Sequence, residues 1–443
     1  MRSALLLFLC VLQVTAAAER PNLIIILADD LGWGDVSFNG RKEWQTPNLD
    51  RLARQGTVFK RWYTAAVVCA PSRAALMTGK YSIHDGVSGN NEDLPRSETT
   101  LAEALKPLGY NTALFGKWHH GTTRKGETNY VHPLDHGFDQ FFGYTDAVAA
   151  WEHFPTNLWF GREQRPVKGY SATLVTDRAI EFFKEQKKQK APFFLYQAYI
   201  EPHLKIEAPE EDVARFRGKF PEDNPNEPTN ARYAAMVTRL DKEIGRLLKS
   251  LDELGLAKNT LIVFSSDHGA TFEGGNRGSA AYHDSNAPFR GHKRTLWEGG
   301  IRVPAIVRWP GEVPVRRVSQ EIIHMTDVFP SMLAAAGAQP DPAWHVDGAN
   351  VLDVWRGKTK APERTLFWEW RSEGSFQLAA MRGNMKVVIP TKEIFDRVST
   401  NKNALAELYD VVRDPAERRT LAMSKTNIAH SLQNELISWI KAP

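Results

Sequence analysis

Apolar residues form two kinds of pattern along the chain, one typical of buried strands and the other of helices. Residues 22–28 and 260–266 are continuous, β-branched and apolar, and each run ends at an acidic residue. Strands that are apolar on both faces are typical of parallel sheets covered by helices. Segment 192–198 has the same pattern, and 301–309 has it more weakly. This pattern predicts an α/β domain over about residues 20–340. Helical periodicity alternates with the strands, at 99–108, 173–188, 233–254 and 326–336.

After Gly337 the pattern changes to short strand-like pieces followed by one amphipathic helix. Short strands separated by turns indicate a small antiparallel sheet, which we expect to pack on the main domain. We therefore divide the chain into a signal peptide (1–18), a main domain (19–340) and a C-terminal subdomain (341–443). The pieces are 365–370, 377–381, 386–389 and 408–411, and the helix is 428–440.

Residues 1–18 have the organisation of a signal peptide, since Arg2 precedes an apolar run at 4–14 and alanines at 16–18 offer a cleavage site. No later run approaches the ~20 apolar residues of a membrane-spanning helix, so we expect no membrane span. Cleavage would leave Cys69 as the only cysteine, which excludes an internal disulfide. The chain also contains no Asn-x-Ser/Thr sequence. We therefore expect an exported protein, periplasmic or secreted, and bacterial rather than lysosomal.

The composition is that of a folded protein with a nearly balanced charge. Hydrophobic residues make up 42% of the 443 residues and charged residues 24%, which excludes a disordered or low-complexity chain. Lys and Arg total 56 and Asp and Glu total 52, so the net charge is only +4. Without a block of Lys or Arg, this balance argues against a nucleic-acid partner and suits an anionic substrate. The composition leaves the oligomeric state open.

Acidic residues follow the two most apolar strands. Asp29 and Asp30 follow 22–28, and Asp267 and His268 follow 260–266. Ligands of open α/β sheets bind outside the carboxyl ends of the strands, so we expect these side chains to meet at one edge. Neighbouring carboxylates would raise one another's pKa, and a hard cation such as Ca²⁺, which takes about 6–8 oxygen ligands, would relieve that repulsion. The alternative is that these aspartates cap the helices that follow the strands.

Cys69 begins the segment CAPSRAALMTG, which ends at Gly79. Pro71 suits the first turn of a helix and Gly79 suits its C-terminal cap, so the segment predicts a helix that begins near Cys69. There the free amides, the helix dipole and Arg73 would attract anions and lower the pKa of the thiol. A lowered pKa would make Cys69 a nucleophile, and the alternative is a small buried apolar residue.

The Cys-x-Pro-Ser-Arg sequence within CAPSRAALMTGKY resembles the signature of the type I, formylglycine-dependent sulfatases of the alkaline phosphatase superfamily. The resemblance covers nearly the whole mature chain. The pattern of motifs is similar to that of the arylsulfatase A and N-acetylgalactosamine-6-sulfatase branch of the family. It implies an α/β/α sandwich around a large mixed, mostly parallel sheet, with residues 19–340 as the catalytic domain and 341–443 carrying a small antiparallel sheet. Further segments resemble landmarks of the family in the same order, namely ADDLGWGD (28–35), TPNLDRLARQG (46–56), FGKWH (115–119), HPLDHGFDQFFG (132–143), SSDHG (265–269), LWEGGIRVPAIVRWPG (296–311) and LYDVVRDPAE (408–417).

The resemblance implies that a separate maturation enzyme oxidises Cys69 to Cα-formylglycine, which hydrates to a geminal diol. One diol oxygen, bound to Ca²⁺, would attack sulfur in line, and the alcohol would leave. The second hydroxyl would then eliminate sulfate and restore the aldehyde. The metal ligands implied are Asp29, Asp30, residue 69, Asp267 and His268, of which His268 replaces the more common asparagine.

The resemblance also assigns roles to five side chains around the diol. Arg73 and Lys117 correspond to the residues that hold the diol and its developing charge. His119 corresponds to the base that assists sulfate release, a role that suits an imidazole. His203 corresponds to a sulfate-binding histidine that helps to protonate the leaving oxygen. Lys293 corresponds to a lysine that bridges the sulfate and the leaving group.

The sequence indicates a sulfated carbohydrate as substrate, either a glycosaminoglycan or an algal or host glycan, or else an aryl sulfate. Two other functions stay open, a formylglycine enzyme for phosphodiesters or phosphonate monoesters, and a glycan-binding protein with an unconverted cysteine. Relative rates on sulfate and phosphate aryl esters would separate the first of these from a sulfatase. The indication of a carbohydrate rests on the aromatic stretch 151–159 and on cationic residues near the motifs, namely His120, Arg124, Lys125, Arg277, His283, His292 and Arg294.

Overall fold

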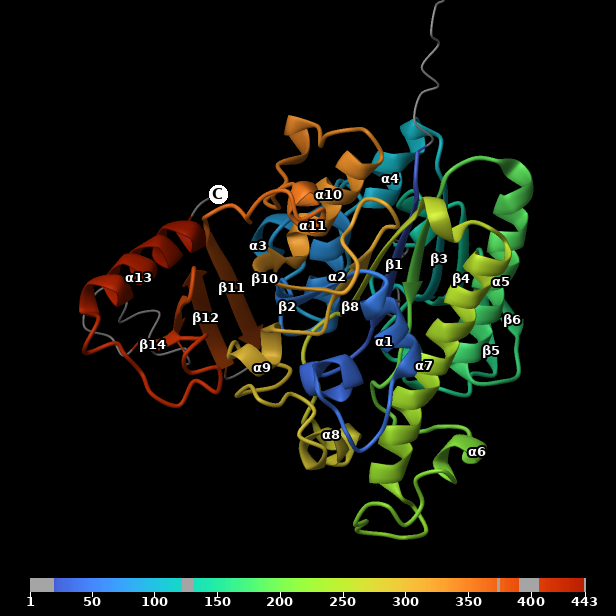
Figure 1. The fold of residues 1–443 in the computed structure, drawn as a ribbon, viewed down its shortest axis with the longest axis horizontal. Coiled ribbons are helices and arrows are strands. Elements are labelled where there is room, and N and C mark those ends of the chain that lie inside the picture. Colours follow the sequence, from blue (N-terminus) through green and yellow to red (C-terminus); the bar gives the residue numbers. More distant parts are fainter. Residues whose placement is uncertain (1–19, 122–130, 373–374, 390–405, 442–443) are drawn as a thin grey trace, which may run out of the picture.

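The computed structural model describes residues 20–121, 131–372, 375–389 and 406–441 (Figure 1). The predicted signal peptide, 1–18, lies outside these residues. A ten-stranded sheet forms the centre of the molecule, and a four-stranded sheet lies to one side of it (Figure 1).

The central sheet is mixed and mostly parallel, with the strand order β10-β2-β9-β8-β1-β7-β3-β4-β5-β6. In its middle, β1 (Asn22–Ala28) pairs in parallel with both β7 (Phe193–Ala198) and β8 (Thr260–Ser266). Antiparallel pairs occur where β9 lies between β8 and β2, and along the edge formed by β4, β5 and β6. The other strands are β2 (Thr57–Tyr63), β3 (Asn111–Lys117), β4 (Gln140–Tyr144), β5 (Asn157–Phe160), β6 (Glu163–Pro166), β9 (Ile306–Arg308) and β10 (Arg317–His324).

Helices cover both faces of this sheet because its central strands are apolar on both sides. Ile24 and Ile26 of β1 belong to one core cluster, and Leu23 and Ile25 belong to another. The first cluster includes residues of α1 (Pro47–Arg54), α5 (Ser171–Gln189) and α7 (Thr229–Glu253). The second includes residues of α2 (Cys69–Thr78), α4 (Leu101–Leu105), α10 (Val328–Ala335) and α11 (Leu352–Trp355). The remaining short helices are α3 (Ser82–Asp85), α6 (Glu210–Val213), α8 (Ser279–Tyr282) and α9 (Glu298–Ile301).

The four-stranded sheet is antiparallel and packs between a helix and the main domain. One face contributes Leu378 and Leu408 to a core with Leu432 and Leu436 of the last helix, α13 (Thr426–Lys441). The other face packs Trp368 and other residues on Tyr63 at the end of β2. The strands, in sheet order, are β11 (Thr365–Ser372), β12 (Ser375–Arg382), β13 (Met385–Ile389) and β14 (Glu407–Asp410).

The predicted fold class is confirmed, and one predicted strand is wrong over most of its length. The segment 301–309 was expected to form a strand, but only Ile306–Arg308 does so, as β9. Only Ile301 belongs to the end of α9, and the next four residues make a single isolated bridge, from Arg302 to Tyr63. Pro304 lies in this stretch and has no amide hydrogen to donate to a strand ladder, so the strand begins only at Ile306.

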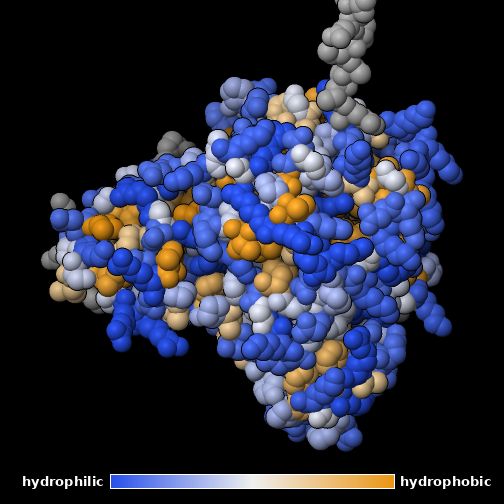
Figure 2. Space-filling model, in the orientation of Figure 1, coloured by the Kyte–Doolittle hydropathy of each residue, from blue (hydrophilic) through white to orange (hydrophobic). Residues whose placement is uncertain are grey.

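The surface carries no large apolar area on the face seen in Figure 2, where apolar residues form small patches separated by hydrophilic ones. Within the described part of the chain, no helix combines the length and the apolar character needed to cross a bilayer. Surfaces of this kind give no indication of an apolar docking site.

Asp35 provides a test of how burial affects stability. Its carboxylate is fully buried and accepts hydrogen bonds from the Gly32 amide (2.9 Å) and the Tyr233 hydroxyl (2.7 Å). Burial raises the pKa of Asp35 from 3.8 to about 6, against the opposing effects of Arg41 and these hydrogen bonds. The folded chain therefore binds the proton more tightly than the unfolded chain does. This contribution to stability is present below pH 3.8 and is lost as the pH rises through about 6.

We predict that Asp35→Asn removes this pH dependence, because the amide resembles the protonated carboxyl. Relative to the wild type, the variant should gain roughly 3 kcal/mol in unfolding free energy between about pH 4 and pH 7. Chemical unfolding of both proteins over this range measures the difference. A constant difference at every pH would contradict the prediction.

Candidate active site

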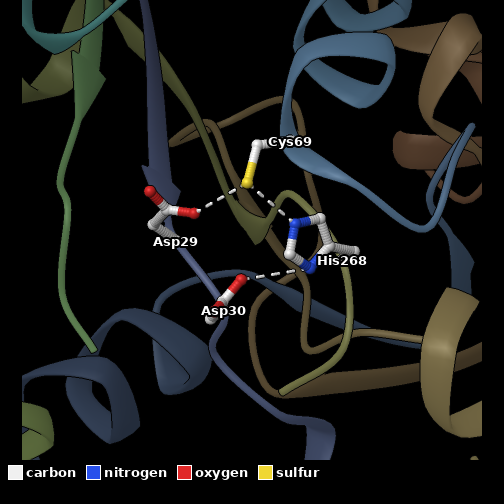
Figure 3. A group of neighbouring side chains, drawn as sticks. All are labelled: Asp29, Asp30, Cys69 and His268. Atoms are coloured by element: carbon white, nitrogen blue, oxygen red, sulfur yellow. Dashed lines mark hydrogen bonds and ion pairs between the residues drawn. The ribbon is translucent and has the colours of Figure 1, made fainter. Parts of the chain in front are cut away.

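The site lies at the edge of the central sheet where β1 and β8 end. These strands pair in register, with Ala28 opposite Ser266, so the residues that follow them leave the sheet side by side. Asp29 and Asp30 therefore meet His268, and the first turn of α2 brings Cys69 to the same place (Figure 3). All four side chains are buried. The expected convergence at one edge is thus present.

Asp29, Asp30, Cys69 and His268 form a group that could hold a metal ion, since one ligand atom from each lies within 4.8 Å of the others. The Cys69 Sγ is 3.5 Å from Asp29 Oδ1 and 3.2 Å from His268 Nε2 (Figure 3). The other ring nitrogen, His268 Nδ1, is 3.3 Å from Asp30 Oδ1. The two carboxylates fit a hard divalent cation, and an oxygen at residue 69 would fit it better than sulfur. The imidazole of His268, and the sulfur of Cys69 while it is unconverted, are the donors that suit softer metals as well.

Asp267 lies beside this group and is tied to Arg73. Its Oδ2 accepts from Arg73 Nη2 at 2.9 Å, and its Oδ1 accepts from the Asp30 amide at 3.1 Å and lies 3.6 Å from His268 Nε2. Burial and the nearby charge of Asp29 raise the pKa of Asp267 to about 7. Burial is the larger cause of this shift, and repulsion from Asp29 adds to it; a divalent cation would relieve that repulsion.

Three permanent cations surround the carboxylates. Lys117 Nζ is 2.6 Å from Asp29 Oδ2, Lys293 Nζ is 3.1 Å from Asp30 Oδ1, and Arg73 contacts both Asp29 and Asp267. Because these three cations face three carboxylates, a bound divalent cation would leave the pocket positive, which suits an anionic ester.

Local backbone packing holds the two lysines in place. Lys117 ends β3 directly after Gly116, whose φ is +111° and where a Cβ would lie 1.8 Å from the Ala198 carbonyl oxygen. Only glycine allows this close approach of β3 to β7. Lys293 is fixed by its amide, which donates to the carbonyl of Ala270 at 3.1 Å, just beyond His268.

Cys69 is a strongly perturbed group. It begins α2, which ends at Gly79 as the sequence predicted, and its side chain is 1% exposed. Burial alone would raise the pKa of the thiol, but Lys117, Lys293 and His268 hold it well below its usual value. A thiolate at this position would be reactive rather than inert.

Two further histidines border the pocket. His203 Nε2 is 3.3 Å from Lys293 Nζ and 3.8 Å from Asp30 Oδ2. Burial and Lys117 lower the pKa of His119 to about 4, so its imidazole is neutral at physiological pH and can accept a proton. Its Nδ1 is buried and has no hydrogen-bond partner among the described residues.

Comparison with known proteins identifies the family. A family model described as Sulfatase matches residues 21–338. The chain belongs to the sulfatase family. A second model, for the C-terminal region of N-sulphoglucosamine sulphohydrolase, matches residues 291–442. The family predicted from the Cys69 motif and its companions is therefore confirmed, and its members are sulfuric ester hydrolases.

Individual relatives support the same family. The sulfatase is 34% identical to N-acetylgalactosamine-6-sulfatase of Mus musculus, in a match that covers 82% of this chain and 72% of the relative. It is 30% identical to steryl-sulfatase of Mus musculus, over 91% of this chain and 79% of the relative. A crystal structure of Ps i-CgsB in complex with k-i-k-neocarrahexaose has a TM-score of 0.84 and 28% identity, and the match covers 95% of this chain and 93% of that one.

Several cations expected near the site do not supply charge there. Burial, His119 and His136 lower the pKa of His120 well below its usual value, so this residue is neutral. His283 is also neutral, with a pKa lowered to about 4 by burial, and Arg277 pairs with Glu227. His292 and Arg294 do flank Lys293, whereas Arg124 and Lys125 lie outside the described residues.

Glu273 is a further charged residue at the site, which its sequence context does not indicate. Its Oε2 is 3.4 Å from Lys293 Nζ, and its Oε1 accepts from Arg294 Nε at 2.7 Å. Burial would raise its pKa, but Lys293 and Arg294 lower it to about 2, so it remains charged. Glu273 therefore gives Lys293 a second carboxylate partner besides Asp30. A single glutamate beside two glycines carries no sequence pattern that marks such a role.

Proposed function

We propose that this sulfatase hydrolyses sulfate esters of a carbohydrate through formylglycine at residue 69 and a bound Ca²⁺. The observation that carries the proposal is the position of Cys69, at the start of α2 and within 3.5 Å of Asp29 and His268. Formylglycine would supply the oxygen nucleophile for sulfur, and Ca²⁺ would supply charge neutralisation. Asp29, Asp30, Asp267 and His268 would hold the cation together with residue 69.

The surrounding side chains would orient the ester and move protons. Arg73 and Lys117 fix the carboxylates and favour negative charge at residue 69, since both cations are buried beside it. Lys293 Nζ would bind the sulfate oxygens, held between Asp30 and Glu273. His203, 3.3 Å from Lys293, would donate a proton to the leaving oxygen. His119, neutral because of its burial, would take up the proton that accompanies sulfate release.

The names of the relatives support a sulfated glycan as substrate. One relative is an N-acetylgalactosamine-6-sulfatase, and a similar structure was solved with a neocarrahexaose bound. A glycosaminoglycan or an algal or host glycan fits both, and an aryl sulfate would serve as a small substrate. We also propose that a maturation enzyme acts on this chain, and that residues 1–18 are removed when the protein is exported to the periplasm or out of the cell. The catalytic domain would be residues 19–340, and residues 341–443 would form the C-terminal subdomain.

Mass spectrometry of the peptide around residue 69 tests the proposal. Protein made together with a formylglycine-generating enzyme should carry an aldehyde that is trapped as a hydrazone, and it should hydrolyse aryl sulfate faster than aryl phosphate. Removal of divalent cations by a chelator should abolish turnover, and Ca²⁺ should restore it. An unmodified thiol despite a competent maturation enzyme, or a preference for phosphate, would overturn the proposal.

A further inference from the structure

A pocket that none of the proposed site residues lines is found at the seam between the two sheets. It has a volume of about 570 Å³, within the range of ligand sites. Its walls come from Trp33 and Phe289, from β2, and from the segments next to β13 and β14. None of the residues proposed for catalysis or metal binding lines it. Its lining residues are Trp33, Lys60, Arg61, Pro288, Phe289, Arg302, Gln320, Asn384, Val411, Val412 and Pro415.

The pocket is positively charged. Lys60, Arg61 and Arg302 line it, and no acidic residue of the described chain does. Arg302 is paired behind the pocket with the buried Glu298, at 3.2 Å, so the unpaired charge comes from Lys60 and Arg61. Lys60 Nζ donates to Asn39 Oδ1 at 2.6 Å, and Arg61 donates to Asn384 Oδ1 at 2.8 Å. Neither Lys60 nor Arg61 forms an ion pair with any residue that the structure describes. Neither charge is therefore neutralised by a carboxylate of the described residues, although Lys60 Nζ also lies over the Trp33 ring, 4.9 Å from its centroid.

Two details indicate that these cations lack a ligand. Arg61 is only 7% exposed, yet its Nε has no hydrogen-bond partner among the described residues. Burial, and after it repulsion from the neighbouring Arg302, lowers the pKa of Lys60. An anion in the pocket would satisfy the free donor and relieve this repulsion.

The aromatic walls add a second kind of recognition. Trp33 and Phe289 meet edge to face, with ring centroids 5.0 Å apart. Trp33 and Pro288 also line a neighbouring pocket of about 500 Å³, whose lining holds two cations, Arg41 and Lys42, and two acidic residues, Glu43 and Asp284. The two pockets thus adjoin at Trp33 and offer room for more than one sugar ring, beside aromatic side chains and cations.

We propose that these adjoining pockets, the Trp33 groove, bind a segment of a sulfated glycan chain outside the active site. The proposal rests on the proposed action on sulfated glycans. Sulfate groups of the chain would contact Lys60 and Arg61, and sugar rings would pack on Trp33. The groove would hold a polymeric substrate while the active site acts on a different part of it. Turnover of a small aryl sulfate would not need the groove.

Binding measurements on full-length protein test this inference. The probes are chondroitin 6-sulfate and carrageenan oligosaccharides, each beside its desulfated form, and the protein carries Cys69→Ala so that no turnover occurs. Lys60→Gln and Arg61→Gln should each weaken binding of a sulfated probe about tenfold, since each removes a charge-assisted contact. Lys360→Gln, which removes an exposed cation outside the groove, is the matched control. Desulfated probes should bind weakly to every variant.

The same groove substitutions in the matured, otherwise wild-type enzyme should leave kcat/KM for an aryl sulfate within about twofold. Thermal unfolding shows whether the Arg61 variant is folded. If the Arg61 variant is not folded, the binding measured for the Lys60 variant alone tests the inference. Three results would overturn the inference: binding equal to the control, displacement of the glycan by millimolar inorganic sulfate, or equal affinity for single-stranded DNA. Failure of the proposed function would instead appear as an unmodified Cys69 or an inactive matured enzyme.

Discussion

Replacing Cys69 with alanine is expected to abolish sulfate ester hydrolysis, with a loss of about 10⁴-fold or more in kcat. The alanine cannot be oxidised to formylglycine, so the variant would lack the proposed nucleophile. The metal group would also lose one of its four candidate ligands, because the Sγ lies among Asp29, Asp30 and His268. Turnover of an aryl sulfate by matured wild-type and variant proteins measures the loss.

A second comparison separates formylglycine from a simple thiol nucleophile. Lys117, Lys293 and His268 lower the pKa of Cys69, so the unconverted protein would carry a reactive thiolate. Protein made without a maturation enzyme should nevertheless be inactive, and co-expression of that enzyme should restore turnover. If the unconverted protein hydrolysed the ester as fast as the matured one, the thiol would be the nucleophile. Unfolding curves of all forms control for loss of structure.

The central strands that could be predicted from the sequence are those that are stabilised by the burial of apolar side chains on both faces of the sheet. The apolar runs inside β1 (Leu23–Ala28) and β8 (Leu261–Phe264) are continuous, and the observed bounds of both strands equal the predicted ones. β2 was missed because Lys60 and Arg61 interrupt its apolar run. Arg61 is buried all the same, because it donates to Asn384 and Gly383 of the four-stranded sheet. Because these hydrogen-bond partners are more than 300 residues away in the sequence, no local pattern around Arg61 predicts its burial.

Some residues of the candidate site could be predicted from the strand pattern, whereas others could be predicted only from family motifs or not at all. The acidic residues follow apolar strands, so the strand pattern alone placed Asp29 and Asp267 at one edge. Lys117 and His203 came only from family motifs, since a lone lysine or histidine has no periodic context. The contact of Glu273 with Lys293 depends on how two loops pack, which neither pattern nor motif encodes.

Lys386→Met is expected to destabilise the protein by about 3–5 kcal/mol, because it would leave the buried carboxylate of Glu417 without a cation and Glu298 with Arg302 alone. Lys386 on β13 is fully buried, and its Nζ lies 2.8 Å from both Glu298 Oε1 and Glu417 Oε1. Burial and Glu298 already raise the pKa of Glu417 to about 7 even with the lysine present. The lysine therefore holds two like charges together at the seam between the sheets.

The pair Arg382–Glu435 provides a matched control within the same sheet. Its side chains are 47% and 33% exposed, so Arg382→Met should cost no more than about 1 kcal/mol. Equal losses for the two variants would show that Lys386 contributes nothing beyond an ordinary surface charge. Adding Glu417→Gln to Lys386→Met should recover part of the loss, because it removes one unpaired carboxylate.

The hydrogen bonds of Lys386 also link the four-stranded sheet to the loop that carries Lys293 of the candidate site. Lys386 Nζ donates to the carbonyl of Leu296 at 3.2 Å, and Gln377 of β12 accepts from the Leu296 amide at 3.1 Å. Leu296 lies three residues after Lys293, so the four-stranded sheet anchors the loop that carries this lysine. Lys386→Met should therefore raise KM for an aryl sulfate below the unfolding temperature, where folding is complete. A variant with lowered stability and unchanged KM would show that the anchor does not reach Lys293.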